Sequence, residues 1–196
     1  MMKASGIVLA GGKSTRMGRD KANIRLGSQT MLERSVEKLQ QIFDEVIIVS
    51  DRPSKYALTG TRQVFDIYGG KGPLGGIHAG LSVAGNSNAF ITACDMPFWQ
   101  PEMAAFLLQC LEDYDAAIPR VAGYIEPLFA VYSKRCLPAV EACLQQDIYK
   151  IIEVFPLLKV KYVEEEAWGK FGDTDKIFIN INTPQELKTL LRGMTV

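Results

Sequence analysis

Short apolar runs alternate with amphipathic segments along most of the chain. The apolar runs are rich in β-branched residues, which is typical of strands. The first, second and fourth of them are almost entirely apolar, as strands buried on both faces of a sheet must be. The pattern therefore predicts strands at residues 6–10, 45–50, 62–65, 89–93, 115–119, 127–132, 158–163 and 177–181.

Between these runs, apolar residues recur at the spacing of an α-helix. The segment 30–43 begins with Thr30, and Glu33 completes a capping box. The segment 101–113 begins with a proline, which suits the first turn of a helix, and the segment 182–191 begins with Asn-Thr-Pro for the same reason. The positions expected to face the core are Leu32, Val36, Leu39 and Phe43 in the first segment, and Met103, Phe106, Leu107 and Cys110 in the second.

Strands that alternate with helices are typical of an α/β fold, in which a mostly parallel twisted sheet carries helices on both faces. The chain has 196 residues, which suits a single Rossmann-like domain over residues 1–196. Sheets of this kind bind ligands at the carboxyl ends of their strands. A ligand site is therefore expected just after residues 10, 50, 65 and 93.

Composition narrows the class of protein. Lysine plus arginine and aspartate plus glutamate both number 22, so the net charge is zero and a general nucleic-acid partner is not expected. No apolar run approaches the ~18 residues of a membrane span, and the apolar stretch near the N-terminus is too short for a signal peptide. With a single histidine and no CxxC pair, the four cysteines are predicted to be free thiols of a cytoplasmic protein.

Positive charge gathers near the N-terminus of this neutral chain. Residues 1–25 contain six lysines and arginines and one acid, Asp20. Such a local excess of positive charge suits a small polyanion as ligand. The alternative is an ordinary solvated basic surface.

The segment 8–21, VLAGGKSTRMGRDK, contains the Gly-Lys-Ser-Thr letters of a P-loop. A Walker A motif needs another glycine five positions before Gly12, where an isoleucine stands, and the GxGxxG dinucleotide fingerprint is absent. What remains is a predicted strand followed by Gly11 and Gly12, which let the backbone approach phosphates closely. Arg16 and Lys21 could then neutralise a triphosphate. The alternative is a plain glycine-rich turn between a strand and a helix.

Carboxylates follow two further predicted strands. Asp95 comes soon after the buried run 89–93 and is well placed to hold Mg²⁺ above a phosphate loop. That ion takes one or two carboxylates together with phosphate oxygens and water. The alternative is an aspartate that caps the turn before Pro97. Asp66 follows the predicted strand 62–65 in the same way.

The loop LAGGKSTRMGRDK resembles the signature LAGGxxxRMGxDK of the molybdenum cofactor guanylyltransferases, a family within the nucleotidyltransferase superfamily. The segments CDMP, GGKGPLGGIHAGL and INTPQEL are similar to further motifs of that family, so the resemblance extends from residue 6 to residue 190. It implies a fold of the nucleotide-diphospho-sugar transferase type. Relatives that use CTP tend to read Leu-Ala-Ala-Gly in the loop, so the paired glycines here favour GTP.

The resemblance also implies roles for particular residues. Arg16, Lys21 and Asp95 correspond to catalytic residues, with Asp95 as the Mg²⁺ ligand. Asn180 and Asn182 would contact the acceptor, and the alternative for that segment is a helix cap. The implied nucleotide-binding residues are Leu9, Ala10, Gly11, Gly12, Lys21, Asp66, Gly75 and Asp95.

The implied reaction transfers GMP from GTP to the terminal phosphate of molybdopterin, or of its molybdenum-loaded form, and releases pyrophosphate. A phosphate monoester has a second pKa near ~6, so no general base is required and His78 is given no catalytic role. The nucleotide would bind the half at about residues 1–100, and the acceptor the half at about 101–196. Transient contacts with proteins that make or receive the cofactor are expected, and contacts with a membrane are not.

Other functions stay open at this point. The nearest are cytidylyl transfer to the same pterin and nucleotidyl transfer to a sugar phosphate. An oxidoreductase that binds NAD or FAD is disfavoured because GxGxxG is missing. A non-catalytic nucleotide sensor with the same fold is disfavoured because Arg16, Lys21 and Asp95 are all present.

Overall fold

The structure, a computed structural model, describes most of the chain. The described residues are 2–11, 20–51, 56, 58–69, 72–172, 177–179, 181 and 186. The predictions for Gly12, Arg16, Asn180 and Asn182, and for the helix start at Thr183, lie outside them.

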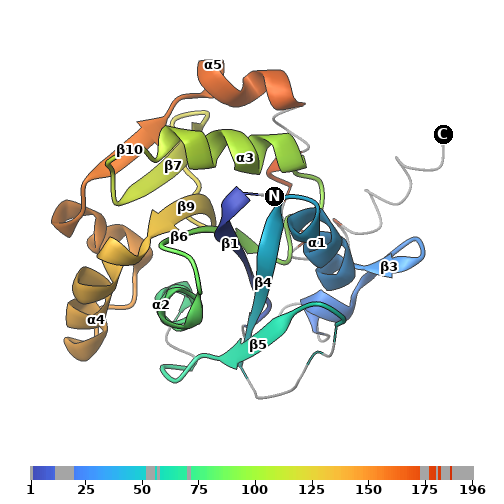
Figure 1. Cartoon of the computed structure of the whole chain (residues 1–196), viewed down its shortest axis with the longest axis horizontal. Coiled ribbons are helices and arrows are strands. Elements are labelled where there is room, and N and C mark those ends of the chain that lie inside the picture. Colours follow the sequence, from blue (N-terminus) through green and yellow to red (C-terminus); the bar gives the residue numbers. More distant parts are fainter. Residues whose placement is uncertain are drawn as a thin grey trace.

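The core of the fold is an eight-stranded sheet with helices on both faces (Figure 1). Its strands lie in the order β10, β7, β9, β6, β1, β4, β5, and β8 pairs with β7. Their bounds are β1 Met2–Leu9, β4 Phe43–Ser50, β5 Arg62–Phe65, β6 Asn88–Ala93, β7 Ala116–Val121, β8 Tyr124–Ile125, β9 Phe129–Ser133 and β10 Val160–Val163. A separate antiparallel pair comprises β2 Arg25–Leu26 and β3 Gln29–Thr30.

Parallel pairing dominates the sheet, as predicted. Strand β1 is parallel to β4 and β6, β4 is parallel to β5, and β7 is parallel to β10. Strand β9 is antiparallel to both of its neighbours, β6 and β7. The link from β7 to β9 is too short for a crossover helix, so the chain returns in the opposite direction.

Helices cover both faces of the sheet, which confirms the α/β prediction. Helices α1 and α3 share one apolar cluster with Val8, and helices α2 and α4 share another with Ile7. Ile7 and Val8 are consecutive in β1, so their side chains point to opposite faces. Figure 1 shows α1 and α2 on opposite sides of β4. The helix bounds are α1 Met31–Gln40, α2 Pro73–Val83, α3 Pro101–Cys110, α4 Leu137–Gln145 and α5 Glu165–Trp168.

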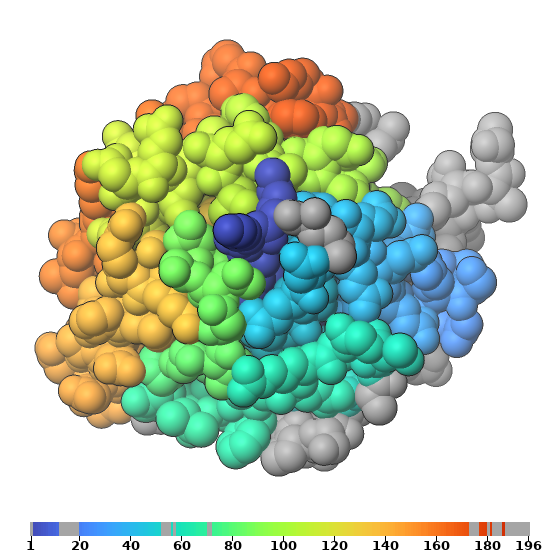
Figure 2. Space-filling model, in the orientation of Figure 1, coloured from blue at the N-terminus to red at the C-terminus, as the bar shows by residue number. Residues whose placement is uncertain are grey.

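Strand β1 lies in the middle of the sheet. Its residues from Ala4 to Leu9 are all buried, and only the beginning of the strand reaches the surface in the space-filling view (Figure 2). Burial on both faces explains why the run that predicted this strand contains no polar residue. The end of β1 is thereby held beside the ends of β4 and β6.

The capping box predicted for α1 is present. The Thr30 hydroxyl accepts a hydrogen bond from the Glu33 amide at 3.1 Å, and the Glu33 carboxylate accepts one from the Thr30 amide at 2.6 Å. The helix ends at Gln40, however, and Phe43 begins β4 instead of extending the helical stripe. The ring of Phe43 is buried and stacks on Phe90, so its apolar character serves the strand.

Helix α3 forms where the pattern predicted it, with a narrower buried stripe. Met103 and Leu107 are fully buried, whereas Phe106 and Cys110 are only partly buried at the edge of the cluster. Phe106 instead packs its ring against Phe171, with ring centroids 5.2 Å apart. The outer side of α3 is therefore covered by a later segment of the chain.

The strand predicted at residues 177–181 is wrong for the residues that the structure describes there, which belong to no strand. Ile177 and Ile181 are nevertheless buried, and the partly buried Phe178 ring packs edge-on against Phe129 at 5.4 Å between centroids. The amide of Ile181 donates to the carbonyl of Asp95 at 3.1 Å instead of to a sheet neighbour. An apolar run fills a core equally well from a loop, which the sequence pattern does not distinguish from a strand.

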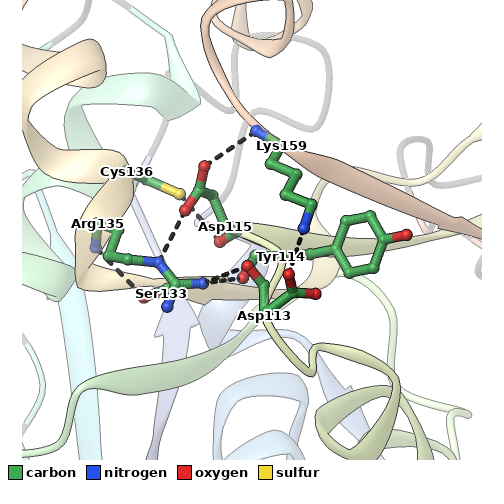
Figure 3. Close-up of polar contacts among 7 residues, drawn as sticks. All are labelled: Asp113, Tyr114, Asp115, Ser133, Arg135, Cys136 and Lys159. Carbon is green, nitrogen blue, oxygen red and sulfur yellow. Dashed lines mark hydrogen bonds and ion pairs between the residues drawn. The ribbon is translucent and has the colours of Figure 1, made fainter.

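Asp115 joins three segments of the chain (Figure 3). It lies at the end of the sheet where the parallel strands begin, opposite their carboxyl ends. Its carboxylate accepts hydrogen bonds from the Arg135 guanidinium at 2.8 Å and from the Lys159 amide at 2.9 Å. Arg135 also donates to the carbonyl of Asp113 at 3.0 Å. These contacts hold the starts of β7 and β10 beside the end of β9.

The cysteines are free thiols, as the sequence predicted. All four cysteines are free, and three of them are buried while Cys110 is partly buried. Among the described residues, no helix combines the length and the apolar character that crossing a bilayer requires.

Candidate active site

A cavity of about 410 Å³ opens at the carboxyl ends of the parallel strands. Backbone hydrogen bonds join the strand ends in its wall, from the Ala10 amide to the Val49 carbonyl at 2.8 Å and from the Cys94 amide to the Leu9 carbonyl at 3.1 Å. The cavity therefore lies where the strand pattern predicted a ligand. The lining residues that follow β1, β4, β5 and β6 include Gly11, Asp51, Asp66 and Asp95.

Lys21 and Asp95 meet across the cavity. The Lys21 Nζ atom lies 2.9 Å from Oδ2 of Asp95, and both side chains are about one-fifth exposed, at 22% and 18%. Asp95 is in the turn after β6, where the Ile181 amide holds its carbonyl. The structure thus brings together two of the three residues predicted to be catalytic, and the third, Arg16, lies outside the described residues.

Lys21 is presented by a short helical turn. The 3₁₀ helix Lys21–Asn23 begins after Asp20, whose Oδ1 accepts a hydrogen bond from the Ala22 amide at 3.2 Å. Capping by a carboxylate satisfies a backbone donor that the turn would otherwise leave free. Asp20 itself lines the cavity beside Lys21.

Tyr56 and Asp20 take part in the site and were missed by the sequence reasoning. The Tyr56 hydroxyl lies 2.8 Å from Oδ2 of Asp20 and 3.2 Å from the carbonyl oxygen of Ala10. Asp20 could have been noticed, because it precedes Lys21 in the quoted loop signature. Tyr56 belongs to no motif, so only the folded structure shows that it touches both ends of the loop segment.

Asp66 faces the cavity from the end of β5. Its Oδ1 accepts a hydrogen bond from the Tyr68 amide at 2.8 Å. Burial raises the pKa of Asp66, against the opposing effects of the Tyr68 amide and of nearby His78. A β-carbon added at Gly75 would lie 2.5 and 2.7 Å from the two Asp66 oxygens. Gly75 therefore contacts Asp66 closely, although it is not among the described residues that line the cavity.

Helix α2 begins at the wall of the cavity. Its N-cap, Gly72, has φ of 86°, a left-handed conformation that favours glycine, and Pro73 occupies the first helical position. A β-carbon at Gly76 would lie 3.3 Å from the Leu9 side chain, so this turn packs closely on β1. The positive end of the helix dipole therefore borders the cavity, which favours anionic ligands.

Three of the residues predicted to bind the nucleotide at the glycine loop are described, and all three line the cavity. They are Leu9, Ala10 and Gly11. A β-carbon at Gly11 would lie 3.2 Å from the Asp51 amide nitrogen, so a glycine relieves crowding between the ends of β1 and β4. The proposed contact of Gly12 with phosphate lies outside the described residues.

Cys94 stands next to Asp95 but is not suited to be a nucleophile. Burial, with a smaller contribution from the Asp95 charge, raises the pKa of the Cys94 thiol to about 12. A thiol with that pKa stays protonated near neutral pH, and the thiolate is the reactive form. Cys94 is therefore not a candidate nucleophile at this end of the sheet.

A mostly parallel α/β sheet that gathers a glycine-containing turn, a lysine and several aspartates around one cavity has the features of a nucleotide-binding enzyme. The chain belongs to the MobA-like NTP transferase family, whose domain model matches residues 6–162. It is therefore a nucleotidyltransferase, and the family predicted from the loop signature is confirmed.

Relatives in the same family align along almost the whole chain. A probable molybdenum cofactor guanylyltransferase from Pelotomaculum thermopropionicum is 42% identical over 187 residues, which cover 95% of this chain and 91% of that protein. The crystal structure of molybdopterin-guanine dinucleotide biosynthesis protein A from Archaeoglobus fulgidus superposes with a TM-score of 0.84 at 30% identity, covering 97% of this chain and 98% of that one.

A more distant protein shares the fold alone. Rv0371C from Mycobacterium tuberculosis, solved in complex with manganese, has a TM-score of 0.65 and 16% identity, and the match covers 100% of both chains. The manganese belongs to that protein. The nucleotide-diphospho-sugar transferase type of fold expected from the sequence is confirmed by these superpositions.

Proposed function

We propose that this enzyme transfers GMP from GTP to the terminal phosphate of molybdopterin, or of its molybdenum-loaded form, giving the guanine dinucleotide form of the cofactor and pyrophosphate. The observation that carries the proposal is 42% identity, over 95% of the chain, to a protein named as a probable molybdenum cofactor guanylyltransferase. The cavity at the strand ends supports it, because its lysine, helix N-terminus and close-packed glycines suit a triphosphate.

In this proposal the residues around the cavity bind and orient GTP. Lys21 and Arg16 stabilise charge on the α-phosphate and on the departing pyrophosphate. The backbone at Gly11 and Gly12 faces the phosphates, while Asp66 contacts the nucleoside. The proposed nucleotide set is completed by Leu9, Ala10, Gly75 and Asp95.

The donor set at Asp95 fits a divalent metal, and we propose Mg²⁺. The carboxylate is a hard oxygen ligand, it borders the cavity, and it already holds one cationic group, the Lys21 ammonium, at 2.9 Å. When bound, the metal would neutralise charge on the α- and β-phosphates. Asp95 is the residue of this chain that would hold it.

The transfer step needs alignment more than proton removal. A terminal phosphate oxygen of the acceptor attacks the α-phosphorus of GTP, a new P–O bond forms, and the bond to the β-phosphate breaks with its electron pair leaving on pyrophosphate. The acceptor phosphate has a second pKa near ~6, so it is already an anion at neutral pH. No general base is assigned, and His78 stays outside the mechanism.

The acceptor is assigned to the second half of the chain, about residues 101–196, and the nucleotide to about 1–100. The cavity supports this division, because all but one of its described lining residues precede residue 100, and the exception is Leu128. Asn180 and Asn182 are the proposed acceptor contacts. We further propose that the enzyme works in the reducing cytoplasm, in transient contact with proteins that make or receive the cofactor.

The proposal is tested by incubating the enzyme with molybdopterin, Mg²⁺ and each of the four NTPs in turn, and by reading the mass of the product. The expected product appears with GTP and equals molybdopterin plus GMP, and the Asp95→Ala variant serves as the inactive control. A product formed with CTP would assign cytidylyl transfer instead. In a parallel incubation with a sugar phosphate in place of molybdopterin, transfer to the sugar phosphate, with none to the pterin in the first assay, would show that the proposed acceptor is wrong.

A further inference from the structure

One buried tyrosine hydroxyl contacts both ends of the segment that holds the glycine loop. The Tyr56 hydroxyl oxygen lies 2.8 Å from Oδ2 of Asp20 and 3.2 Å from the carbonyl oxygen of Ala10. Ala10 follows β1, and Asp20 immediately precedes Lys21. The Tyr56 side chain is buried in the cluster between the sheet and α1, so its hydroxyl is held in place by packing.

Asp20 uses its two carboxylate oxygens in different directions. Oδ1 accepts a hydrogen bond from the Ala22 amide at 3.2 Å and caps the turn that begins at Lys21. Oδ2 faces Tyr56. A carboxylate held at both oxygens keeps one orientation, and the orientation of Asp20 fixes where the turn begins. From that turn, Lys21 reaches Asp95 at 2.9 Å.

Tyr56 acts through its neighbours and not on a ligand. Ala10, Asp20 and Lys21 line the cavity, whereas Tyr56 is not among the described residues that do. We propose that Tyr56 is a positioning residue of the nucleotide site: its hydroxyl holds Asp20 against Ala10 and thereby sets Lys21 in front of Asp95. This inference deepens the proposed function and rests on its assignment of Lys21 to the triphosphate.

Electrostatics explains why a hydroxyl is suited to this position. The Ala10 carbonyl oxygen and the Asp20 carboxylate are both hydrogen-bond acceptors, and two acceptors side by side repel each other. A phenolic O–H between them offers a proton to either, and the contact with the carboxylate is charge-assisted. Replacing Tyr56 by phenylalanine keeps the buried ring but removes that donor, so Asp20 loses the contact at Oδ2 that helps to fix its orientation at the start of the Lys21 turn.

The test compares Tyr56→Phe with Tyr132→Phe. Tyr132 is also buried, and its hydroxyl also donates to a carbonyl, that of Pro127 at 2.8 Å. Both variants therefore lose one buried hydroxyl, but only the first loses a contact with Asp20. The two probes are GTP and inorganic tripolyphosphate, and calorimetric titration measures the Kd of each in the presence of Mg²⁺. Thermal unfolding without ligand records the stability of each variant.

We expect Tyr56→Phe to raise the Kd of both probes about tenfold, as loss of a charge-assisted hydrogen bond would. Tyr132→Phe should lower the unfolding temperature without changing either Kd. An unchanged Kd in Tyr56→Phe, or an equal rise in Tyr132→Phe, would overturn the inference. Tripolyphosphate lacks the base and ribose, so an effect confined to GTP would also overturn it, because Lys21 is assigned to the phosphates.

A double-mutant cycle tests the route through Asp20. Tyr56→Phe in the background of Asp20→Ala should cause no further rise in the Kd of tripolyphosphate, because the hydroxyl has then lost the group that it orients. Independent, multiplying losses would show that Tyr56 acts by another route and would overturn the inference. Failure of the wild-type chain to bind any NTP or tripolyphosphate would overturn the proposed function first, and this inference with it.

Discussion

Lys21 and Asp95 are 74 residues apart in the sequence, yet their side chains form a 2.9 Å ion pair in the lining of the cavity. The pair is possible because β1 and β6 are parallel neighbours whose carboxyl ends lie side by side. Each partner is held from a different direction, Lys21 by the capped turn after Asp20 and Asp95 by the Ile181 amide. The fold thus places one cationic and one anionic group where the proposed reaction develops charge.

Removing either member of this pair should abolish most of the activity while the fold persists. We expect Lys21→Ala and Asp95→Ala each to slow pyrophosphate release by ~10²–10³-fold, the usual cost of losing an electrostatic element of a transition state.

The matched control for this experiment is Lys159→Ala. Lys159 pairs with Asp113 on the exposed surface at the opposite edge of the sheet, as Figure 3 shows. Its loss should leave pyrophosphate release unchanged. Release near the wild-type rate by Asp95→Ala would show that the proposed metal assignment is wrong.

Gly75→Ala should displace the Asp66 carboxylate, because the added methyl group would lie 2.5 Å from its Oδ1. We expect the Kd of GTP to rise by about ten- to a hundredfold, as loss of a hydrogen bond to a charged group would. Alanine is the better helix former by about 1 kcal/mol, so weaker binding would not reflect a weaker helix. Isothermal titration with GTP measures the change.

Gly169→Ala is the control for this prediction, since an added methyl group there would meet no described atom within 4 Å. It should bind GTP as the wild type does. If Gly75→Ala bound GTP normally and its crystal structure showed Asp66 displaced, the contact between Asp66 and the nucleoside would have to be abandoned.

Lys38 predicts a pH dependence of stability. Its Nζ atom donates to the carbonyls of Pro97 and Trp99, at 2.8 and 2.5 Å. Burial lowers the pKa of Lys38 from 10.5 to about 8, with a smaller contribution from Arg34. Between pH 8 and pH 10.5 the unfolded chain therefore binds more protons at this residue than the folded chain does, so the contribution of Lys38 to folding becomes more favourable as the pH rises.

The measurement compares urea unfolding of the wild type and Lys38→Met across that interval. Other groups titrate in both proteins, so the difference between their free energies of unfolding reports on Lys38 alone. The free energy of unfolding of the wild type, relative to the variant, should increase from about pH 8 to about pH 10.5. Parallel pH profiles of the two proteins would show that Lys38 keeps its ordinary pKa.

The sequence predicted the central strands of the sheet well, because a strand that is buried on both faces must consist mostly of apolar residues. The runs that became β1, β4 and β6 are almost entirely apolar, so the sequence predicted these strands and, from them, a ligand site at their carboxyl ends. Only the family resemblance could predict that Asp95 and Lys21 belong to one site. Neither segment shows by its own sequence which strands are neighbours in the sheet.

The errors have a common physical cause. Phe43, Ile177 and Ile181 are apolar because they are buried, and burial alone does not specify a helix, a strand or a loop. Tyr56 could not be predicted for a related reason. Its role depends on two contacts with residues far away in the sequence, and neither contact leaves a periodic trace.

The Asp115 junction should contribute to stability and not to catalysis. Its carboxylate accepts hydrogen bonds from Arg135 and from the Lys159 amide at the start of β10, at the edge of the sheet away from the cavity (Figure 3). Burial tends to raise the pKa of Asp115, but these two donors outweigh it and the pKa is lowered overall. A carboxyl group whose pKa is lowered by folding stabilises the protein above its unfolded pKa of 3.8, and this contribution is lost as the pH falls below it.

Asp115→Ala leaves the Lys159 amide and the Arg135 guanidinium without this acceptor, so we expect it to lower the free energy of unfolding by about 1–3 kcal/mol at neutral pH. Asp113→Ala is the control, because Asp113 is 73% exposed and solvent screens its pairing with Lys159, so its loss should change the stability little. Urea unfolding of the three proteins at neutral and acidic pH makes the comparison, and the gap between wild type and Asp115→Ala should narrow in acid. Equal stability of the two variants would show that the junction does not fasten β7 to β10, and slower pyrophosphate release by folded Asp115→Ala would show that its influence reaches the opposite edge of the sheet.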